Sequence, residues 1–170
     1  MSHTIIDTNA AVVANGNSAQ ASQRCAAACE RLLQEFTADR RRLVIDSSWH
    51  ILREYIRNLR SEGQPGAGDA FLRWVLTNQA NPQRCEQVAI TTRPDAQSEH
   101  DFAEFPDDPA LERFDPSDRK FVAVARAHPE HPPIHYAIER GWYRYQAALA
   151  SHGLTIIQVC PDDMQRGMAG

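Results

Sequence analysis

Short apolar runs alternate along this chain with longer stretches in which apolar residues recur at helical spacing. The apolar runs predict strands over residues 3–7, 42–46, 87–90, 134–138 and 154–159. The helical spacing predicts helices over 18–37, from Ser47 or Ser48 to about residue 60, and over 69–78, 118–125 and 141–151. Asp108-Pro109 and Asp115-Pro116 each combine an N-cap residue with a proline at the first helical position, which is typical of a helix start.

Strands that alternate with helices favour a parallel sheet with helices on both faces. We therefore predict a three-layer α/β/α fold with a central, mostly parallel sheet of about four to five strands. Residues 1–160 form a single domain in this interpretation, the polar stretch 91–107 is a loop, and 161–170 are a C-terminal tail. Binding sites in such sheets form beyond the carboxyl ends of the strands.

Two acidic residues lie where such a site is expected. Asp7 directly follows the first strand and precedes Thr8 and Asn9, whose side chains are further oxygen donors. Asp118 stands at the third position of the helix that starts at Asp115-Pro116, where an acid favours the helix dipole even without a function. Asp118 also projects from the apolar side of that helix, and an acid there is costly unless it is paired or binds a metal.

Glu54 and Glu139 are less specific candidates from their positions alone. Glu54 lies roughly 60° beyond the edge of an apolar helix face, which suits either a cleft or solvent. That face comprises Trp49, Ile51, Leu52, Tyr55, Ile56 and Leu59. Glu139 follows the strand 134–138 at a helix start, where an acid needs no function. Gathered at one sheet edge, the four carboxylates would be able to hold Mg²⁺ or Mn²⁺ against a phosphate substrate.

Other residues that bind metals or act as nucleophiles form weaker patterns. Cys25 and Cys29 lie one helical turn apart without a second ligand pair, so we interpret them as buried or half-buried thiols. His128, His131 and His135 have ligand-like spacing, but the prolines among them indicate an irregular loop rather than a zinc site. The chain contains no glycine-rich phosphate loop and no GxSxG motif.

Composition and charge narrow the function classes further. The chain is 42% hydrophobic and 24% charged, as globular proteins are, and no stretch approaches the length of a membrane span. Its N-terminus does not resemble a signal peptide, so we expect a cytoplasmic protein. The net charge of −4 disfavours broad coating of nucleic acid. Arginines concentrate in the first third, however, where they could contact a phosphate backbone: Arg40, Arg41, Arg42, Arg53, Arg57 and Arg60.

Together these segments resemble the PIN domain, a family of metal-dependent ribonucleases with a parallel sheet between helices. The match covers most of the chain and rests on four segments in the family's order: Ile5-Ile6-Asp7-Thr8-Asn9, the helix with Glu54, the run 118–125 and the run 136–142. The resemblance implies hydrolysis of phosphodiester bonds in single-stranded RNA. It implies these catalytic residues and ligands of Mg²⁺ or Mn²⁺: Asp7, Glu54, Asp118 and Glu139. It offers these substrate contacts: Asn9, Arg53, Arg57 and Arg119.

The chain departs from the family pattern at the fourth segment. Glu139 stands where Asp is commoner, and Gly141 stands where a second acid often lies. The alternatives are therefore a working nuclease and a catalytically weakened PIN-like module that binds RNA or a protein. A phosphatase or nucleotide-binding protein with the same sheet architecture is a third interpretation. Many PIN domains are toxins, so the resemblance permits an antitoxin-type protein partner as well as a homodimer.

Overall fold

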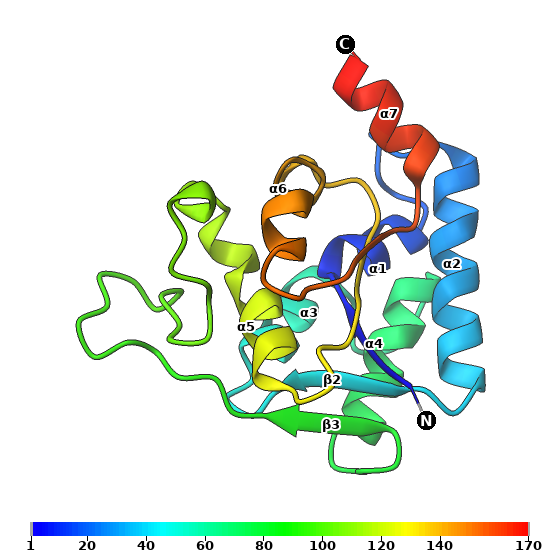
Figure 1. Cartoon of the computed structure of the whole chain (residues 1–170). Coiled ribbons are helices and arrows are strands. Elements are labelled where there is room, and N and C mark those ends of the chain that lie inside the picture. Colours follow the sequence, from blue (N-terminus) through cyan, green and yellow to red (C-terminus); the bar gives the residue numbers. More distant parts are fainter. Residues whose placement is uncertain (1, 170) are drawn as a thin grey trace.

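The computed structural model describes residues 2–169 and contains one parallel β-sheet of five strands (Figure 1). The strands are β1 (His3–Ile6), β2 (Arg42–Asp46), β3 (Cys85–Val88), β4 (Ile134–Tyr136) and β5 (Ile156–Gln158). They lie in the order β3-β2-β1-β4-β5, and every neighbouring pair is parallel. The predicted α/β class with a three-layer α/β/α arrangement is confirmed, and all strands rather than most are parallel.

Helices cover the sheet on both sides. They are α1 (Thr8–Ala14), α2 (Gln23–Ala38), α3 (His50–Asn58), α4 (Ala67–Asn78), α5 (Arg119–Ala127), α6 (Arg140–Ala150) and α7 (Pro161–Ala169). The 3₁₀ turns η1 (Pro109–Leu111) and η2 (Pro116–Asp118) precede α5. Figure 1 shows α2 and α4 on one side of the sheet and α5 and α6 on the other. Within residues 2–169, no helix is both long enough and apolar enough to cross a membrane.

The strand order determines where a site can form. From β1 the chain passes to β2 and β3 on one side of the sheet and only later to β4 and β5 on the other. Beyond the carboxyl ends of β1 and β4 the connections therefore diverge, which leaves the crevice where open α/β sheets bind ligands. The central strands are apolar and completely buried, so this crevice has a rigid floor: Ile5, Ile6, Val44, Ile45 and Ile134.

Several predicted boundaries are wrong, and hydrogen bonds explain the differences. The helix predicted over 18–37 begins only at Gln23, because the Ser22 side chain accepts a hydrogen bond from the Cys25 backbone N–H. Helix α1 has no counterpart among the predicted elements. Residues 161–169 form α7 rather than a loose tail, and its Asp163 carboxylate accepts hydrogen bonds from the backbone N–H and the hydroxyl of Ser22.

The start of α3 also differs from its prediction. Neither Ser47 nor Ser48 caps the helix; instead, the Asp46 carboxylate accepts hydrogen bonds from the backbone N–H groups of His50 and Ile51, each at 2.9 Å. The chain turns through Trp49, whose φ of 67° is left-handed. Two members of the predicted apolar face therefore lie outside the core, since Trp49 is 51% exposed and Ile56 is 47% exposed.

The cysteines pair across the fold. Cys25 in α2 forms a disulfide with Cys160, which directly precedes α7. The interpretation of Cys25 as a thiol is therefore wrong, because its partner is 135 residues away and only the fold brings the two together. Cys29 remains a free thiol as predicted, buried with its sulfur 3.8 Å from that of Cys160. This disulfide fastens α7 to α2.

Candidate metal centre at the carboxyl edge of the sheet

Three acidic side chains from separate segments meet at the crevice. Asp7 follows β1, Asp118 ends η2, and Glu139 is the N-cap residue of α6. One carboxylate oxygen from each lies within 4.8 Å of the other two. Asp7 is 1% exposed and Asp118 is 5% exposed, while Glu139 is half-buried. The strand-end position predicted for Asp7 and the inward direction predicted for Asp118 are both confirmed.

Hydrogen bonds within η2 and between the segments after β1 and β4 hold these acids in place. The Asp7 backbone N–H donates to the carbonyl of His135 in β4, which places Asp7 at the junction of the two strands. Asp115 caps η2 by accepting a hydrogen bond from the Ser117 N–H, and this turn positions Asp118. The Asn9 side-chain oxygen accepts a hydrogen bond from the Ile138 N–H at 2.9 Å. Asn9, predicted to contact substrate, thus fixes the backbone next to Glu139.

Burial makes the three carboxyl groups hard to ionise without a counter-charge. It raises the pKa of Asp7 well above its usual value, and the charges of Asp118 and Glu139 raise it further. Burial, and after it the charge of Glu139, raises the pKa of Asp118 to about 8. Burial and then the charge of Asp115 raise the pKa of Glu139.

The donor set fits a hard divalent cation. All three groups offer carboxylate oxygens, the ligand type that Mg²⁺ and Mn²⁺ prefer. Oδ2 of Asp7 is buried and has no hydrogen-bond partner among the residues that the structure describes. A buried, unsatisfied carboxylate oxygen is unfavourable unless a cation or proton neutralises it. A divalent ion held by Asp7, Asp118 and Glu139 would relieve both the desolvation and the mutual repulsion.

Glu54 points into this cluster but is already engaged. One of its carboxylate oxygens accepts a hydrogen bond from the Thr8 hydroxyl, and the other lies 3.0 Å from the ammonium nitrogen of Lys120. Glu54 lies outside the group of three convergent ligands. It therefore acts on Asp7, Asp118 and Glu139 through its charge and through the two partners that it holds.

Lys120 is the residue of this site that sequence reasoning missed. It is the only lysine in the chain, and it is just 3% exposed. Its ammonium group also donates a hydrogen bond to the Ser117 carbonyl. A positive charge is thus built into the acidic cluster, where it offsets part of the negative charge. The sequence contained one sign of its importance: the chain has seventeen arginines and a single lysine, and this lysine lies two residues after Asp118.

An open cavity of about 540 Å³ adjoins the acids. Asp118, Glu139 and Gly141 lie on one wall, and Met164 and Gly167 of α7 lie on another. A Cβ atom added at Gly141 would meet no atom within 4 Å. The cavity therefore has room for a substrate group beside the carboxylates, and for a side chain at position 141.

The predicted arginine contacts divide into two kinds. The Arg119 guanidinium donates to the carbonyls of Glu112 and Phe114 and lies 4.6 Å from the ring centroid of Phe105, so it stabilises the loop before α5. Arg53 and Arg57 are exposed on α3, and neither forms an ion pair within residues 2–169. Arg57 has no guanidinium partner among the described residues, and the Arg53 guanidinium makes a single long contact, 3.5 Å to the imidazole Nδ1 of His50.

The three histidines predicted to have ligand-like spacing do not converge. His128 instead lies beside His3 and Glu86 at the opposite, amino-terminal edge of the sheet. The Glu130 N–H donates to Nδ1 of His128 at 3.0 Å, which leaves the proton of the neutral ring on Nε2, 3.4 Å from Glu86. A protonated Nε2 cannot bind a metal, and the Glu86 carboxylate is already hydrogen-bonded to His3 Nε2 at 2.8 Å, so this cluster is a set of histidine–carboxylate contacts.

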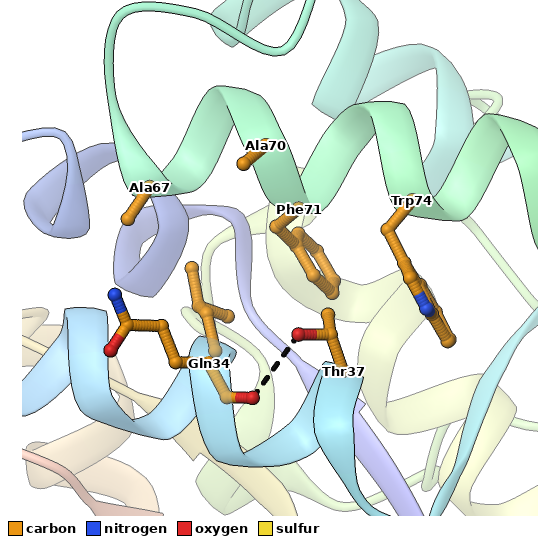
Figure 2. A pocket seen from close by; sticks show the side chains of 7 residues that line it. Gln34, Thr37, Ala67, Ala70, Phe71 and Trp74 are labelled. Atoms are coloured by element: carbon orange, nitrogen blue, oxygen red, sulfur yellow. Dashed lines mark hydrogen bonds between the residues drawn. The ribbon is translucent and has the colours of Figure 1, made fainter.

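A second hollow, of about 210 Å³, lies away from the acids between α2 and α4 (Figure 2). Figure 2 shows Phe71 and Trp74 on α4 facing Gln34 and Thr37 on α2, where the Thr37 hydroxyl donates to the Gln34 carbonyl. No charged side chain lines this hollow. It offers apolar contact but none of the groups that catalysis requires.

Comparison with known proteins adds no relative: no family model, curated protein or solved structure matches this chain. The relationship to the PIN domain therefore stays a prediction from the four sequence segments. The fold and the geometry of the acidic cluster are the observations that bear on function.

Proposed function

We propose that this protein is a divalent-metal-dependent endoribonuclease. The observation that carries the proposal is the convergence of Asp7, Asp118 and Glu139 at the crevice beyond the carboxyl ends of β1 and β4. Two of the three are almost fully buried. Bringing three acids together, two of them buried, is unfavourable unless a cation joins them, and this donor set suits Mg²⁺ or Mn²⁺. The neighbouring cavity provides space for a phosphodiester group.

The residues have distinct roles in this proposal. Asp7, Asp118 and Glu139 hold the ion, which when bound activates water and stabilises charge on the phosphate. Glu54 binds the Thr8 hydroxyl and the Lys120 ammonium group, and these contacts help to fix the positions of the neighbouring carboxylates. Asn9 fixes the backbone that presents Glu139. Arg53 and Arg57 contact the phosphate backbone of single-stranded RNA, as the resemblance to the PIN domain implies.

The biological setting is a further part of the proposal. A cytoplasmic toxin of a toxin–antitoxin pair, with an antitoxin-type partner or a homodimer, agrees with the same resemblance. Disulfides are uncommon in the cytosol. In that compartment Cys25 and Cys160 would therefore be reduced, and α7 would be held to α2 by its remaining contacts. Thiol labelling of protein from intact cells distinguishes the two states, and a fully oxidised pair would contradict a cytoplasmic location.

A catalytically weakened RNA- or protein-binding module is the second candidate. Two observations favour it: position 141 carries no acid although the cavity has room for one, and the Lys120 ammonium group already neutralises part of the cluster. Such a module would bind RNA at the same surface or dock a protein there, without hydrolysis.

Cleavage of a labelled single-stranded RNA in the presence of Mn²⁺ or Mg²⁺ tests the proposal. Cleavage should disappear with a chelator and in Asp7→Asn, whereas Asp95→Asn, which changes an exposed loop acid, should behave as the wild type. Cleavage that survives in Asp7→Asn or without divalent ions would show that the mechanism is wrong. RNA binding without any cleavage would favour the weakened module, and hydrolysis of a phosphate monoester alone would favour a phosphatase.

A further inference from the structure

The turn into α3 holds an aromatic side chain in solvent. Trp49 has a left-handed φ of 67°, and it is more exposed than any other large hydrophobic residue within 2–167. The Asp46 carboxylate enforces this turn, because it bonds the two backbone N–H groups that follow Trp49. A bulky residue rarely adopts this conformation, and such strain tends to occur at functional positions.

Exposed cations follow Trp49 along the same helix. Arg53 lies one turn after Trp49, and its backbone N–H donates to the Trp49 carbonyl. Arg57 lies one turn further, and the half-exposed Ile56 lies beside it. The buried side of α3, with Ile51, Leu52 and Tyr55, faces the core, so these outer residues share the opposite face. We name this face, made of Trp49, Arg53, Ile56 and Arg57, the α3 surface.

The same helix reaches the acidic cluster. Glu54, on the edge of α3, contacts Thr8 and Lys120 beside the candidate ligands. Glu54 lies five positions after Trp49, the N-cap of α3, which corresponds to about 7.5 Å along a helix axis. A chain that crosses the α3 surface would therefore arrive next to the proposed metal centre.

We infer that the α3 surface binds a segment of single-stranded RNA, with Trp49 stacking on a base and Arg53 and Arg57 contacting phosphates. This inference rests on the proposed function and specifies how its substrate is held. Proteins that bind single strands combine aromatic platforms with a cationic track, and the α3 surface has both. The chain as a whole is acidic, so this exposed cationic face stands out as complementary to a polyanion.

Binding of a short fluorescein-labelled oligouridine, measured by anisotropy in Mg²⁺, tests the inference. All variants carry Asp7→Asn so that the RNA stays intact. Trp49→Ala should weaken binding roughly tenfold or more, and Trp49→Phe should remain within about threefold of the parent. Arg53→Ala and Arg57→Ala should each lower the slope of log affinity against log salt by about 0.7. Arg31→Ala, which removes an exposed arginine from α2, is the matched control and should change neither quantity.

Tryptophan fluorescence distinguishes base stacking on Trp49 from a purely structural role of this residue. The chain has three tryptophans, and RNA should quench the emission only where a base stacks on Trp49. Trp49→Phe should therefore bind RNA without quenching. If the Trp49 and arginine variants bind as their parent does, the inference is overturned, and a protein partner becomes the better occupant.

Separate cleavage assays on the wild-type chain keep this result distinct from the proposed function. RNA cleavage combined with unaltered binding by the variants overturns only the role of the α3 surface. RNA binding through Trp49 without cleavage by the wild type supports the surface and overturns the nuclease activity. A wild-type chain that neither binds nor cleaves RNA overturns both.

Discussion

The ammonium nitrogen of Lys120 lies 3.0 Å from Oε1 of Glu54 beside the three candidate ligands, and Lys120 is buried while Glu54 is half-buried. Burial is the main cause of the raised pKa values of Asp7 and Asp118, and the positive charge of Lys120 opposes it. The Lys120–Glu54 ion pair therefore belongs to the electrostatic balance of the site, and four predictions follow from this balance and from the packing around it.

Lys120→Met should destabilise the metal-free protein by about 3 kcal/mol, because it leaves the half-buried Glu54 charge without its partner. The double variant with Glu54→Gln should recover part of that loss, since neither charge then remains. Urea unfolding of both single variants and the double variant gives the coupling energy. Arg31→Met, at an exposed position, should stay within about 0.5 kcal/mol of the wild type. Strictly additive losses would contradict a direct interaction.

Asp118→Asn should make the metal-free protein more stable at neutral pH. The pKa of Asp118 is about 8 in the folded state against 3.8 for the free residue, so between these values the folded state holds a proton that the unfolded state releases. Stability then falls as pH rises from about 4 to about 8. Asparagine removes this dependence.

The expected gain from Asp118→Asn is on the order of a few kcal/mol at pH 7, and it should vanish near pH 4. Thermal unfolding in a chelating buffer across this pH range measures it. The control Asp95→Asn should follow the wild-type profile, because Asp95 is exposed. A gain that is equally large at pH 4 would refute the electrostatic explanation.

Gly141→Asp should strengthen metal binding by the proposed centre. The added Cβ meets no atom within 4 Å, and the new carboxylate would face the cavity that Asp118 and Glu139 line. One more negative charge should lower the half-saturating Mn²⁺ concentration on the order of tenfold, because charges near a protein surface interact by about 1 kcal/mol or more. Isothermal titration with Mn²⁺ measures this change.

Gly167→Asp is the comparison for Gly141→Asp. It places the same charge on the α7 wall of the same cavity, where a Cβ also meets nothing within 4 Å. If both variants change Mn²⁺ affinity equally, a general charge effect rather than the position of residue 141 is responsible.

Removing the disulfide by Cys25→Ser and Cys160→Ser should cost roughly 2–4 kcal/mol in oxidising buffer, since the bond closes a long loop. A thiol reductant should lower the melting temperature of the wild type and leave that of the double variant unchanged. Cys85→Ala, which removes a buried free thiol, should keep its response to the reductant. Reductant-insensitive wild-type protein would contradict the pairing.

The order of the five strands and of helices α2 to α6, and the strand-end position of Asp7, could be read from the sequence, whereas α1 and α7 could not. Apolar alternation and helical spacing reflect neighbours a few residues apart, and a parallel sheet follows from strands that alternate with helices. The burial of Asp118 was also predictable from local spacing, because Asp118 projects from the apolar side of its own helix. The N-caps Asp108 and Asp115 were correct as local hydrogen-bonding motifs.

Contacts between distant residues were decided by the tertiary structure alone. Lys120 meets Glu54 across 66 residues, Cys25 meets Cys160 across 135, and both pairs depend on how whole helices pack. The capping of α3 by Asp46, and hence the exposure of Trp49, arose because a strand-end carboxylate outcompeted the two serines. Periodicity along a chain identifies which face of an element is buried. Which charged groups then meet over the sheet edge depends on packing in three dimensions, because their energies come from neighbours that the local sequence does not contain.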